Sequence, residues 1–201
     1  HLNAGDIITF MPSSCVPWSA LRWLYVTISE NPADTNTATL ADFNDSSWQD
    51  VLLPHNPIED LLWPPWPTIS YEGVSWYRKH FKVDDSYQDR KIFIEFEAAN
   101  VVADVWVNSE HLTTHYGGDL PFTIDITDNV TFGDTENIIA VKVNNWWDPN
   151  VPGINSFGGI YRDVWLHITD KLHVTDAVYA NKAAGGGIFV RYPSVIASAA
   201  E

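Results

Sequence analysis

Two short stretches of the sequence bring aromatic rings and polar groups together outside any regular pattern. One is 63–67 (WPPWP), followed by Tyr71, and the other is 144–149 (NNWWDP). Aromatic rings in such segments could stack on the C–H faces of a sugar while a neighbouring polar group binds its hydroxyls. The same rings could instead plug the ends of a fold, or pack against another domain as large anchors. The residues alone leave both interpretations open.

The composition argues against several other kinds of chemistry. Lys and Arg total 11 against 26 Asp and Glu, and the formal net charge of −15 would repel nucleic acid and anionic membranes. The single cysteine, Cys15, cannot form an internal disulfide, and the seven histidines form no recognisable zinc motif. We therefore expect no cofactor, no metal site and no nucleic-acid partner.

The start of the chain, HLNAGD, has neither the charged nor the apolar region of a signal peptide. An acidic surface is usual in exported proteins, so we expect a secreted or periplasmic protein whose signal peptide is not present in this chain.

The elements that must position the two aromatic stretches read as β-strands. Short runs rich in Val, Ile, Trp, Tyr and Phe recur between Gly, Pro, Asn and Asp, with almost no helical periodicity. In 74–83, Tyr77 and Phe81 would share one face, while Arg78 and His80 would lie on a wet face. Further strands are expected at 91–97, 101–108, 121–126, 136–144, 161–168 and 172–179.

The polar, acidic segment 30–50 is expected to be a surface loop or short helical turn, with few anchors beyond Leu40, Phe43 and Trp48. Together these patterns predict an all-β fold with two antiparallel sheets.

Several phrases resemble the N-terminal domain of family 2 glycoside hydrolases, the family of β-galactosidases, β-glucuronidases and β-mannosidases, and they occur in that family's order. The resemblance covers about residues 45 to 175. The phrases are Trp48 with 51–55 (VLLPH), 71–79 (YEGVSWYRK), 105–108 (VWVN), 115–118 (HYGG), 137–144 (NIIAVKVN) and 158–166 (GGIYRDVWL).

The resemblance implies a jelly-roll-like, galactose-binding-domain-like β-sandwich, followed by an immunoglobulin-like domain and then a TIM barrel. In that family two glutamates of the barrel carry out a retaining mechanism. Neither glutamate would lie in this chain, which alone should be inactive. We expect residues 1–180 to form the sugar-binding sandwich, and 181–201 to form a linker and the first strand of a truncated immunoglobulin-like domain.

The resemblance also implies a site. In the family, the loop that matches 146–157 reaches the mouth of the barrel and often offers an acidic or amide group to the sugar, so Asn155 and Asp148 are the candidates here. The position where an Asp is often seen reads 153–156 (GINS) in this chain. The loop aromatics complete the expected substrate-binding set, with a β-linked glycoside as the ligand. They are Trp146, Trp147, Trp66 and Tyr71.

Two other classes of function fit the same residues. A free-standing carbohydrate-binding module of jelly-roll type would use the aromatic rings as platforms without cleaving the sugar. A structural interaction domain would use them as a protein interface, with no sugar ligand.

Overall fold

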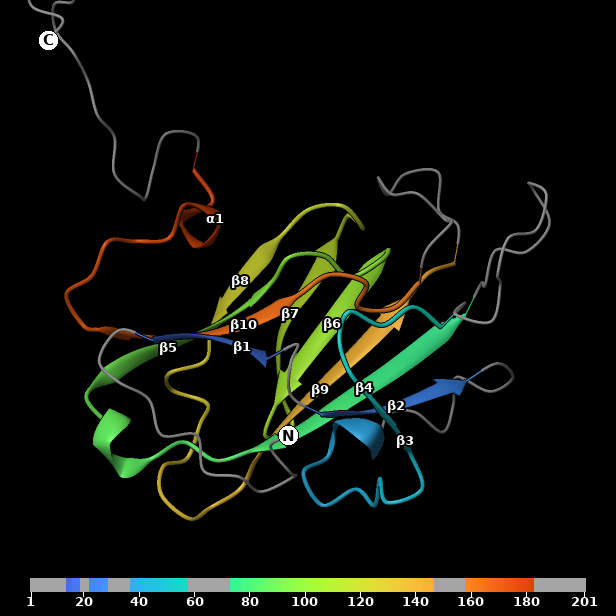
Figure 1. Ribbon diagram of the computed structural model, residues 1–201, viewed down its shortest axis with the longest axis horizontal. Coiled ribbons are helices and arrows are strands. Elements are labelled where there is room, and N and C mark those ends of the chain that lie inside the picture. Colours follow the sequence, from blue (N-terminus) through green and yellow to red (C-terminus); the bar gives the residue numbers. More distant parts are fainter. Residues whose placement is uncertain (1–13, 19–21, 29–36, 58–72, 147–157, 183–201) are drawn as a thin grey trace, which may run out of the picture.

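The computed structural model describes residues 14–18, 22–28, 37–57, 73–146 and 158–182, which form two stacked antiparallel sheets (Figure 1). One sheet has four strands in the order β1-β10-β5-β8, and the other has six in the order β3-β2-β4-β9-β6-β7. The strands of the first sheet are β1 (Ser14–Pro17), β5 (Arg90–Phe96), β8 (Phe122–Asp125) and β10 (Val164–Asp170). Those of the second are β2 (Trp23–Ile28), β3 (Gln49–Val51), β4 (Val74–Phe81), β6 (Val102–Val107), β7 (Glu110–Tyr116) and β9 (Asn137–Asn144).

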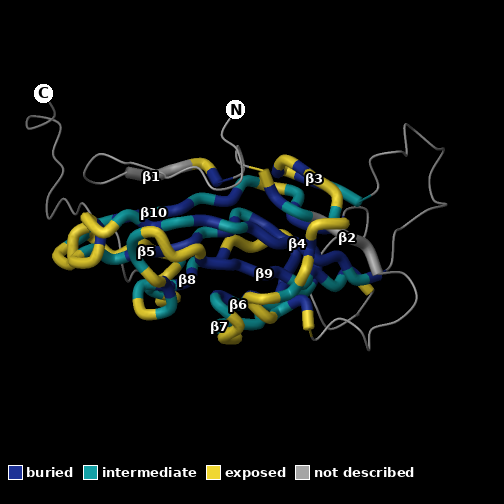
Figure 2. The backbone as a smooth tube through the Cα atoms, turned by 90° about the horizontal axis from the view of Figure 1, so that it is seen from below, coloured by how far each residue is buried: buried dark blue, intermediate teal, exposed yellow. Residues whose placement is uncertain are grey.

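The core lies between the two sheets, where the strand interiors are buried (Figure 2). The alternation in the sequence explains it, because Ile92, Ile94 and Phe96 on β5 all point inward and are fully buried. Phe96 stacks on Phe122 of β8, with the ring centroids 4.8 Å apart. The expected antiparallel, jelly-roll-like β-sandwich is therefore confirmed.

Two fully buried tryptophans belong to the core, one just after β1 and one at the start of β2. Trp18 and Trp23 meet edge to face with their centroids 6.2 Å apart, and Trp18 lies 4.8 Å from the ring of Phe81. Lys79 is buried beside both tryptophans and donates a hydrogen bond to the Arg22 carbonyl oxygen at 3.0 Å. One end of the core thus contains an ammonium group among aromatic rings.

The predicted wet face of β4 is wrong at Arg78, whose side chain is completely buried. The residues from 37 to 48 contain a short 3-10 turn, as expected, but they cover the outer face of the six-stranded sheet. Arg78 donates hydrogen bonds to Asp45 at 2.6 Å and to the carbonyl oxygens of Ala38 and Leu40. A segment distant in sequence therefore converts a solvent-facing position into an interior one.

Other strand predictions also need correction. Residues 172–179 form no strand, because the chain leaves β10 irregularly and ends in the short helix α1 (Ala177–Ala180) beside β8. Strand β10 begins at Val164, three residues later than predicted. Strand β7 was not predicted: it is a mostly polar strand at the sheet edge, and its alternation between apolar and polar residues is weak.

Candidate functional site

The described residues that flank the two aromatic stretches lie at one end of the sandwich. Strand β4 begins where strand β9 ends, with Val74 paired to Asn144 (Figure 1). Residues 58–72 connect to β4 and 147–157 follow β9, and both segments lie outside the described residues. The residues on either side of them are described, and these flanks show how the segments are held.

One flank of each segment is bonded to one flank of the other. The Asn145 side-chain oxygen Oδ1 accepts a hydrogen bond from the Gly73 amide at 2.8 Å, and the Asn145 amide donates to the Gly73 carbonyl oxygen at 3.1 Å. Asn145 is almost fully buried, so these bonds form away from water. The end of one segment and the start of the other are therefore fixed together.

The remaining two flanks are bonded in the same way. Asn56 Oδ1 accepts a hydrogen bond from the Gly158 amide at 3.2 Å, and the His55 amide donates to the Ile160 carbonyl oxygen at 2.8 Å. Both segments consequently start and return within a single cluster of hydrogen bonds.

A third connection links this cluster to the turn that precedes β6. The Asn100 amide donates to the Gly159 carbonyl oxygen at 3.0 Å, and the Val101 amide donates to the Asn144 carbonyl oxygen at 3.1 Å. Two consecutive residues thus hold the chain on both sides of 145–158.

Gly159 occupies a position that a larger residue cannot fill. Its φ of +69° lies in the left-handed region, and a Cβ there would stand 2.1 Å from the Tyr77 hydroxyl and 3.0 Å from the His55 carbonyl oxygen. The Tyr77 hydroxyl is itself 3.0 Å from His55 Nδ1. Gly159 therefore allows the backbone to pass close to Tyr77 and His55.

The turn after β7 meets the segment after Gly159. The Tyr161 hydroxyl lies 2.8 Å from the Gly118 carbonyl oxygen and 3.0 Å from Asp119 Oδ1, so either oxygen can accept its proton. Burial, followed by the hydrogen bond to Asp119, raises the pKa of Tyr161. Beside it, His115 stacks on Phe122 at 4.2 Å, and burial lowers the pKa of His115. These contacts suit a rigid support for a binding surface.

Large apolar side chains remain exposed around this support. Trp146 is 56% exposed, Tyr116 62% and Leu120 55%. Tyr116 pairs with Val102, which also pairs with Asn144, so Tyr116 and Trp146 lie at the same end of the six-stranded sheet. Exposed aromatic groups on a rigid base can bind a sugar face or another protein surface.

Of the six predicted site residues, Trp146 is the one that the structure describes, and it lies at this end in an exposed position. Its amide donates to Asn144 Oδ1 at 3.0 Å. The other candidates fall outside the described residues and stay predictions. They are Trp147, Asp148, Asn155, Trp66 and Tyr71.

The residues that bond the segments together, Asn56, Gly73, Asn100 and Asn145, were not picked out from the sequence. Asn145 lies inside the flagged stretch 144–149, but nothing local marks a buried asparagine as an anchor. Within the described residues, no group of three potential metal ligands is present, and no helix is long and apolar enough to cross a membrane. The polar groups described at this end are suited to positioning and binding.

Comparison with known proteins gives a consistent result. Residues 42–170 match the sequence profile described as "Glycosyl hydrolases family 2, sugar binding domain". The chain is 40% identical over 165 residues to a β-galactosidase of Thermoanaerobacter pseudethanolicus, covering 78% of this chain and 21% of that protein. It is 37% identical over 164 residues to a β-glucuronidase of Formosa agariphila, covering 70% of this chain and 16% of that protein.

A solved structure supports the same relationship. The chain superposes on a β-glucuronidase from glycoside hydrolase family 2 with a TM-score of 0.71 and 33% sequence identity, covering 88% of this chain and 20% of that one. The chain therefore spans about a fifth of the length of the relatives it matches.

Proposed function

Because this chain belongs to glycosyl hydrolase family 2, whose sugar-binding domain it carries in residues 42–170, we propose that it serves as the non-catalytic part of a larger retaining exo-β-glycosidase, β-galactosidase-like in its substrate. In that enzyme it supports the catalytic barrel and lines one wall of the substrate pocket. The hydrolytic glutamates belong to the barrel, so this chain alone binds without cleaving.

The observation that carries the proposal is the double connection between segments 58–72 and 147–157. Asn145 bonds to Gly73, and Gly158 bonds to Asn56, so the flanks of both segments meet at one end of the sandwich. Segments with joined flanks can act as one surface. The exposed ring of Trp146 lies at that surface, as expected for a group that contacts a sugar or a neighbouring domain.

The coverage of the relatives favours a part of an enzyme over a free-standing binding module. The β-galactosidase relative is about five times longer than the matched region, which covers 21% of its length. An accessory domain needs residues that position loops against a neighbour, and the buried Asn145 and the close-packed Gly159 supply them.

The test compares this chain with the full-length enzyme on chromogenic β-galactoside and β-glucuronide substrates. We expect hydrolysis by the full-length enzyme and none by the 201-residue chain. In the full-length enzyme, Asn155→Ala should raise KM or lower kcat, because a lost hydrogen bond to the sugar weakens binding or transition-state stabilisation. Trp146→Ala and Trp147→Ala test stacking in the same assay.

Asn129→Ala is the matched control. The Asn129 side chain donates a hydrogen bond to the exposed Glu110, which pairs with Val107 at the opposite end of β6 from the tied segments. The kinetics of Asn129→Ala should be those of the unmodified enzyme. If Asn155→Ala, Trp146→Ala and Trp147→Ala all leave kcat and KM unchanged, the segments do not line the substrate pocket. If the chain binds sugar tightly and the full-length protein does not hydrolyse the substrates, the chain is a free-standing binding module instead.

A further inference from the structure

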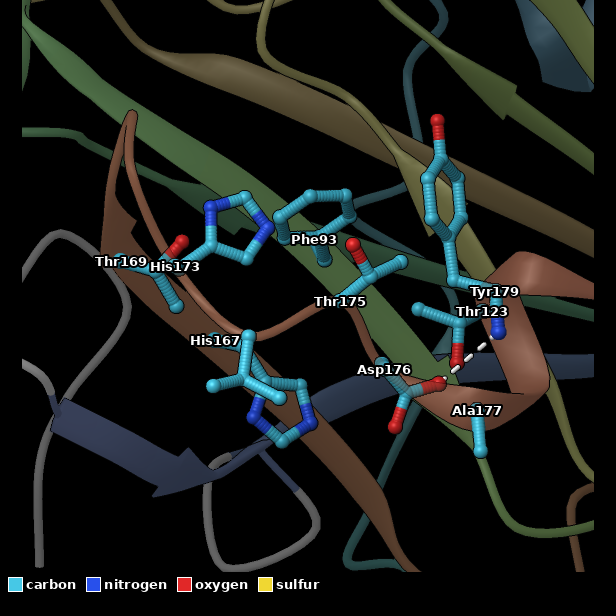
Figure 3. A pocket seen from close by; sticks show the side chains of 10 residues that line it. Phe93, Thr123, His167, Thr169, His173, Thr175, Asp176, Ala177 and Tyr179 are labelled. Carbon is cyan, nitrogen blue, oxygen red and sulfur yellow. Dashed lines mark hydrogen bonds between the residues drawn. The ribbon is translucent and has the colours of Figure 1, made fainter. Parts of the chain in front are cut away.

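A cavity of about 410 Å³ lies on the outer face of the four-stranded sheet, on the side away from the core (Figure 3). Its floor comes from β5, β8 and β10, and its rim comes from the irregular segment after β10 and from α1. The volume is in the range of small-molecule sites in proteins. Its lining residues are Phe93, Thr123, His167, Thr169, His173, Val174, Thr175, Asp176, Ala177 and Tyr179.

Aromatic rings form the apolar part of the cavity. Phe93 stands on its floor and meets His173 and Tyr179 edge to face, with centroid distances of 5.5 Å and 5.0 Å. Figure 3 shows the rings of His173 and Tyr179, from the segment after β10, on either side of Phe93 from β5. Such a wall suits the C–H face of a ring-shaped ligand.

Hydrogen-bonding groups form the rest of the lining, and all of them can accept a hydrogen bond: hydroxyls, imidazoles and the Asp176 carboxylate. His173 Nδ1 lies 2.8 Å from the Asp170 carbonyl oxygen, and His167 Nε2 lies 2.7 Å from Glu95 Oε2. Each imidazole therefore donates through one nitrogen, which leaves the other nitrogen of its neutral form as an acceptor. Asp176 accepts the Tyr179 amide at 2.8 Å through one of its two oxygens. A ligand rich in hydroxyl donors matches this set.

Two threonine hydroxyls in the wall have no hydrogen-bond partner among the described residues. They are Thr123 Oγ1 and Thr169 Oγ1, and both are buried. Buried polar atoms are usually hydrogen-bonded, so an unpartnered pair in one cavity wall is unfavourable in the empty state. Both oxygens are covered by neighbouring atoms, so a ligand hydroxyl would bond either of them only after the threonine side chain rotates toward the cavity.

The charge around the cavity disfavours an anionic ligand. None of the ten described lining residues is Lys or Arg. Lys91 lies on the same face of β5, but its ammonium is bonded to Asp125 at 2.8 Å. With Asp176 and the Glu95 partner of His167 nearby, a phosphate or carboxylate would meet no free cation among these groups.

From these observations we propose that the outer-face cavity binds a neutral pyranose or a short neutral oligosaccharide. The rings of Phe93, His173 and Tyr179 contact the apolar face of the sugar, and the threonine, imidazole and carboxylate groups bind its hydroxyls. This site lies on the β5-β8-β10 face and is distinct from the tied segments at the sandwich end. The proposal for this cavity does not depend on the role proposed for those segments.

The test is a titration of the ¹⁵N-labelled 201-residue chain with galactose, glucose, mannose and lactose, followed by amide chemical shifts. For a ligand of this size we expect a Kd on the order of 1–10 mM. Saturable shifts should occur in residues 167–179 and their neighbours on β5 and β8. If none of the four sugars produces saturable shifts there, the proposal is overturned.

Two variants test the contacts, and two others control for location. Tyr179→Ala should weaken binding by roughly tenfold through the lost ring contact. Thr169→Val should weaken it by about fivefold without reducing stability, because the hydroxyl it removes has no partner in the empty chain. If Tyr179→Ala disturbs the fold, the affinity of Thr169→Val still shows whether the sugar binds in this cavity. Trp146→Ala and Tyr116→Ala, at the sandwich end, should leave this affinity unchanged.

Two outcomes assign the cavity to something else. Binding that is lost in Trp146→Ala and kept in Thr169→Val and Tyr179→Ala would place the sugar at the sandwich end and overturn the proposal. If the chain binds sugar in this cavity but the full-length enzyme does not, another part of the enzyme occupies it, and the proposal is overturned as well.

Discussion

Asn145 and Gly73, 72 positions apart in sequence, satisfy each other's hydrogen bonds at the sandwich end. One asparagine supplies both the acceptor for the Gly73 amide, at 2.8 Å, and the donor for its carbonyl oxygen, at 3.1 Å. Buried amides are costly to leave unpaired, so this connection resists separation. The Asn145 carboxamide is therefore one of the two side chains, with that of Asn56, that join the flanks of segments 58–72 and 147–157.

Replacing that carboxamide tests its role. Asn145→Ala leaves the buried Gly73 amide without its acceptor and should lower the free energy of unfolding by about 1–3 kcal/mol, measured by urea denaturation of this chain. In the full-length enzyme, KM should rise by about fivefold or more, because the flanks of the two segments lose one of the hydrogen bonds between them. Asn129→Ala, at an exposed bond to Glu110, should change the stability by less than about 0.5 kcal/mol. A destabilised Asn145→Ala enzyme with unchanged KM would show that the segments keep their positions without this bond.

Gly159→Ala tests the close approach of the backbone to Tyr77. The new Cβ would stand 2.1 Å from the Tyr77 hydroxyl at a φ of +69°, so we expect a loss of about 3 kcal/mol or more in the free energy of unfolding. Tyr77→Phe removes the clashing oxygen, so Gly159→Ala should cost less in that background. Strict additivity of the two changes in a double-mutant cycle would contradict this contact.

Gly133→Ala separates backbone strain from the clash at Gly159. Its φ is +79°, but the nearest atoms to a Cβ there are the Asp85 carboxylate oxygens at 3.1 Å, at the end of a flexible side chain. We expect a loss of about 1 kcal/mol at this position. A loss equal to that of Gly159→Ala would assign both effects to φ alone.

The buried pair of Arg78 and Asp45 predicts an acid-sensitive fold. Burial alone would raise the pKa of Asp45, but hydrogen bonds from His80 and Arg78 outweigh it and hold that pKa below its ordinary value of 3.8. Because the folded-state pKa is depressed, this stabilisation is present above about pH 4 and is lost as the pH falls through the folded value.

Asp45→Asn removes the charge and leaves Arg78 buried without its counter-ion, so we expect a loss of about 3–5 kcal/mol at pH 7. The difference between the unmodified chain and this variant should shrink as the pH is lowered below 4, measured by thermal or urea unfolding. Asp50→Asn, at the exposed pair with Arg22, should cost less than about 1 kcal/mol. A difference that does not vary with pH would rule out Asp45 as the titrating group.

Lys79 predicts a second rise of stability with pH, in the alkaline range. Burial lowers the pKa of Lys79 from 10.5 to about 8, because the ammonium loses water. The hydrogen bond to the Arg22 carbonyl oxygen only partly replaces that hydration. Between pH 8 and 10.5 the unfolded chain carries more protons at this residue, so stability due to Lys79 should rise across that interval.

Lys79→Met keeps the length of the side chain without the charge. We expect it to raise the free energy of unfolding at pH 7 by about 1–3 kcal/mol and to abolish the rise between pH 8 and 10.5. Lys82→Met, at a more exposed position on the same strand end, is the matched control and should change neither quantity by more than about 0.5 kcal/mol. Destabilisation by Lys79→Met would show that the contacts with Trp18 and Trp23 outweigh the loss of hydration.

The sequence predicted the strands whose burial depends on local alternation. The predicted bounds of β5 and β9 lie within one residue of the observed ones. These strands were predictable because one face of each packs on the facing sheet. Arg78 was misassigned, since its burial depends on residues 37–48, which lie far away in the chain. No pattern within 74–83 distinguishes a buried arginine from a solvated one.

The site shows the same limit. The aromatic stretches stood out because they place several rings outside any alternating pattern, and Trp146 is indeed exposed. The asparagines that anchor the segments did not stand out in the sequence, because tertiary structure decides which group a carboxamide bonds. The cavity beside β10 was missed for a related reason, since 172–179 was assigned to a strand and instead folds over the sheet.

The anchoring of the segments also has a consequence for engineering. Their four flanking connections use backbone groups and two asparagine carboxamides, and none depends on the residues between the flanks. Segments 58–72 and 147–157 could therefore both be replaced by the corresponding segments of a relative, while the flanking residues keep their hydrogen bonds. If the segments line the substrate pocket as proposed, exchanging one of them alone would combine two unmatched surfaces, and substrate preference should transfer only when both are exchanged.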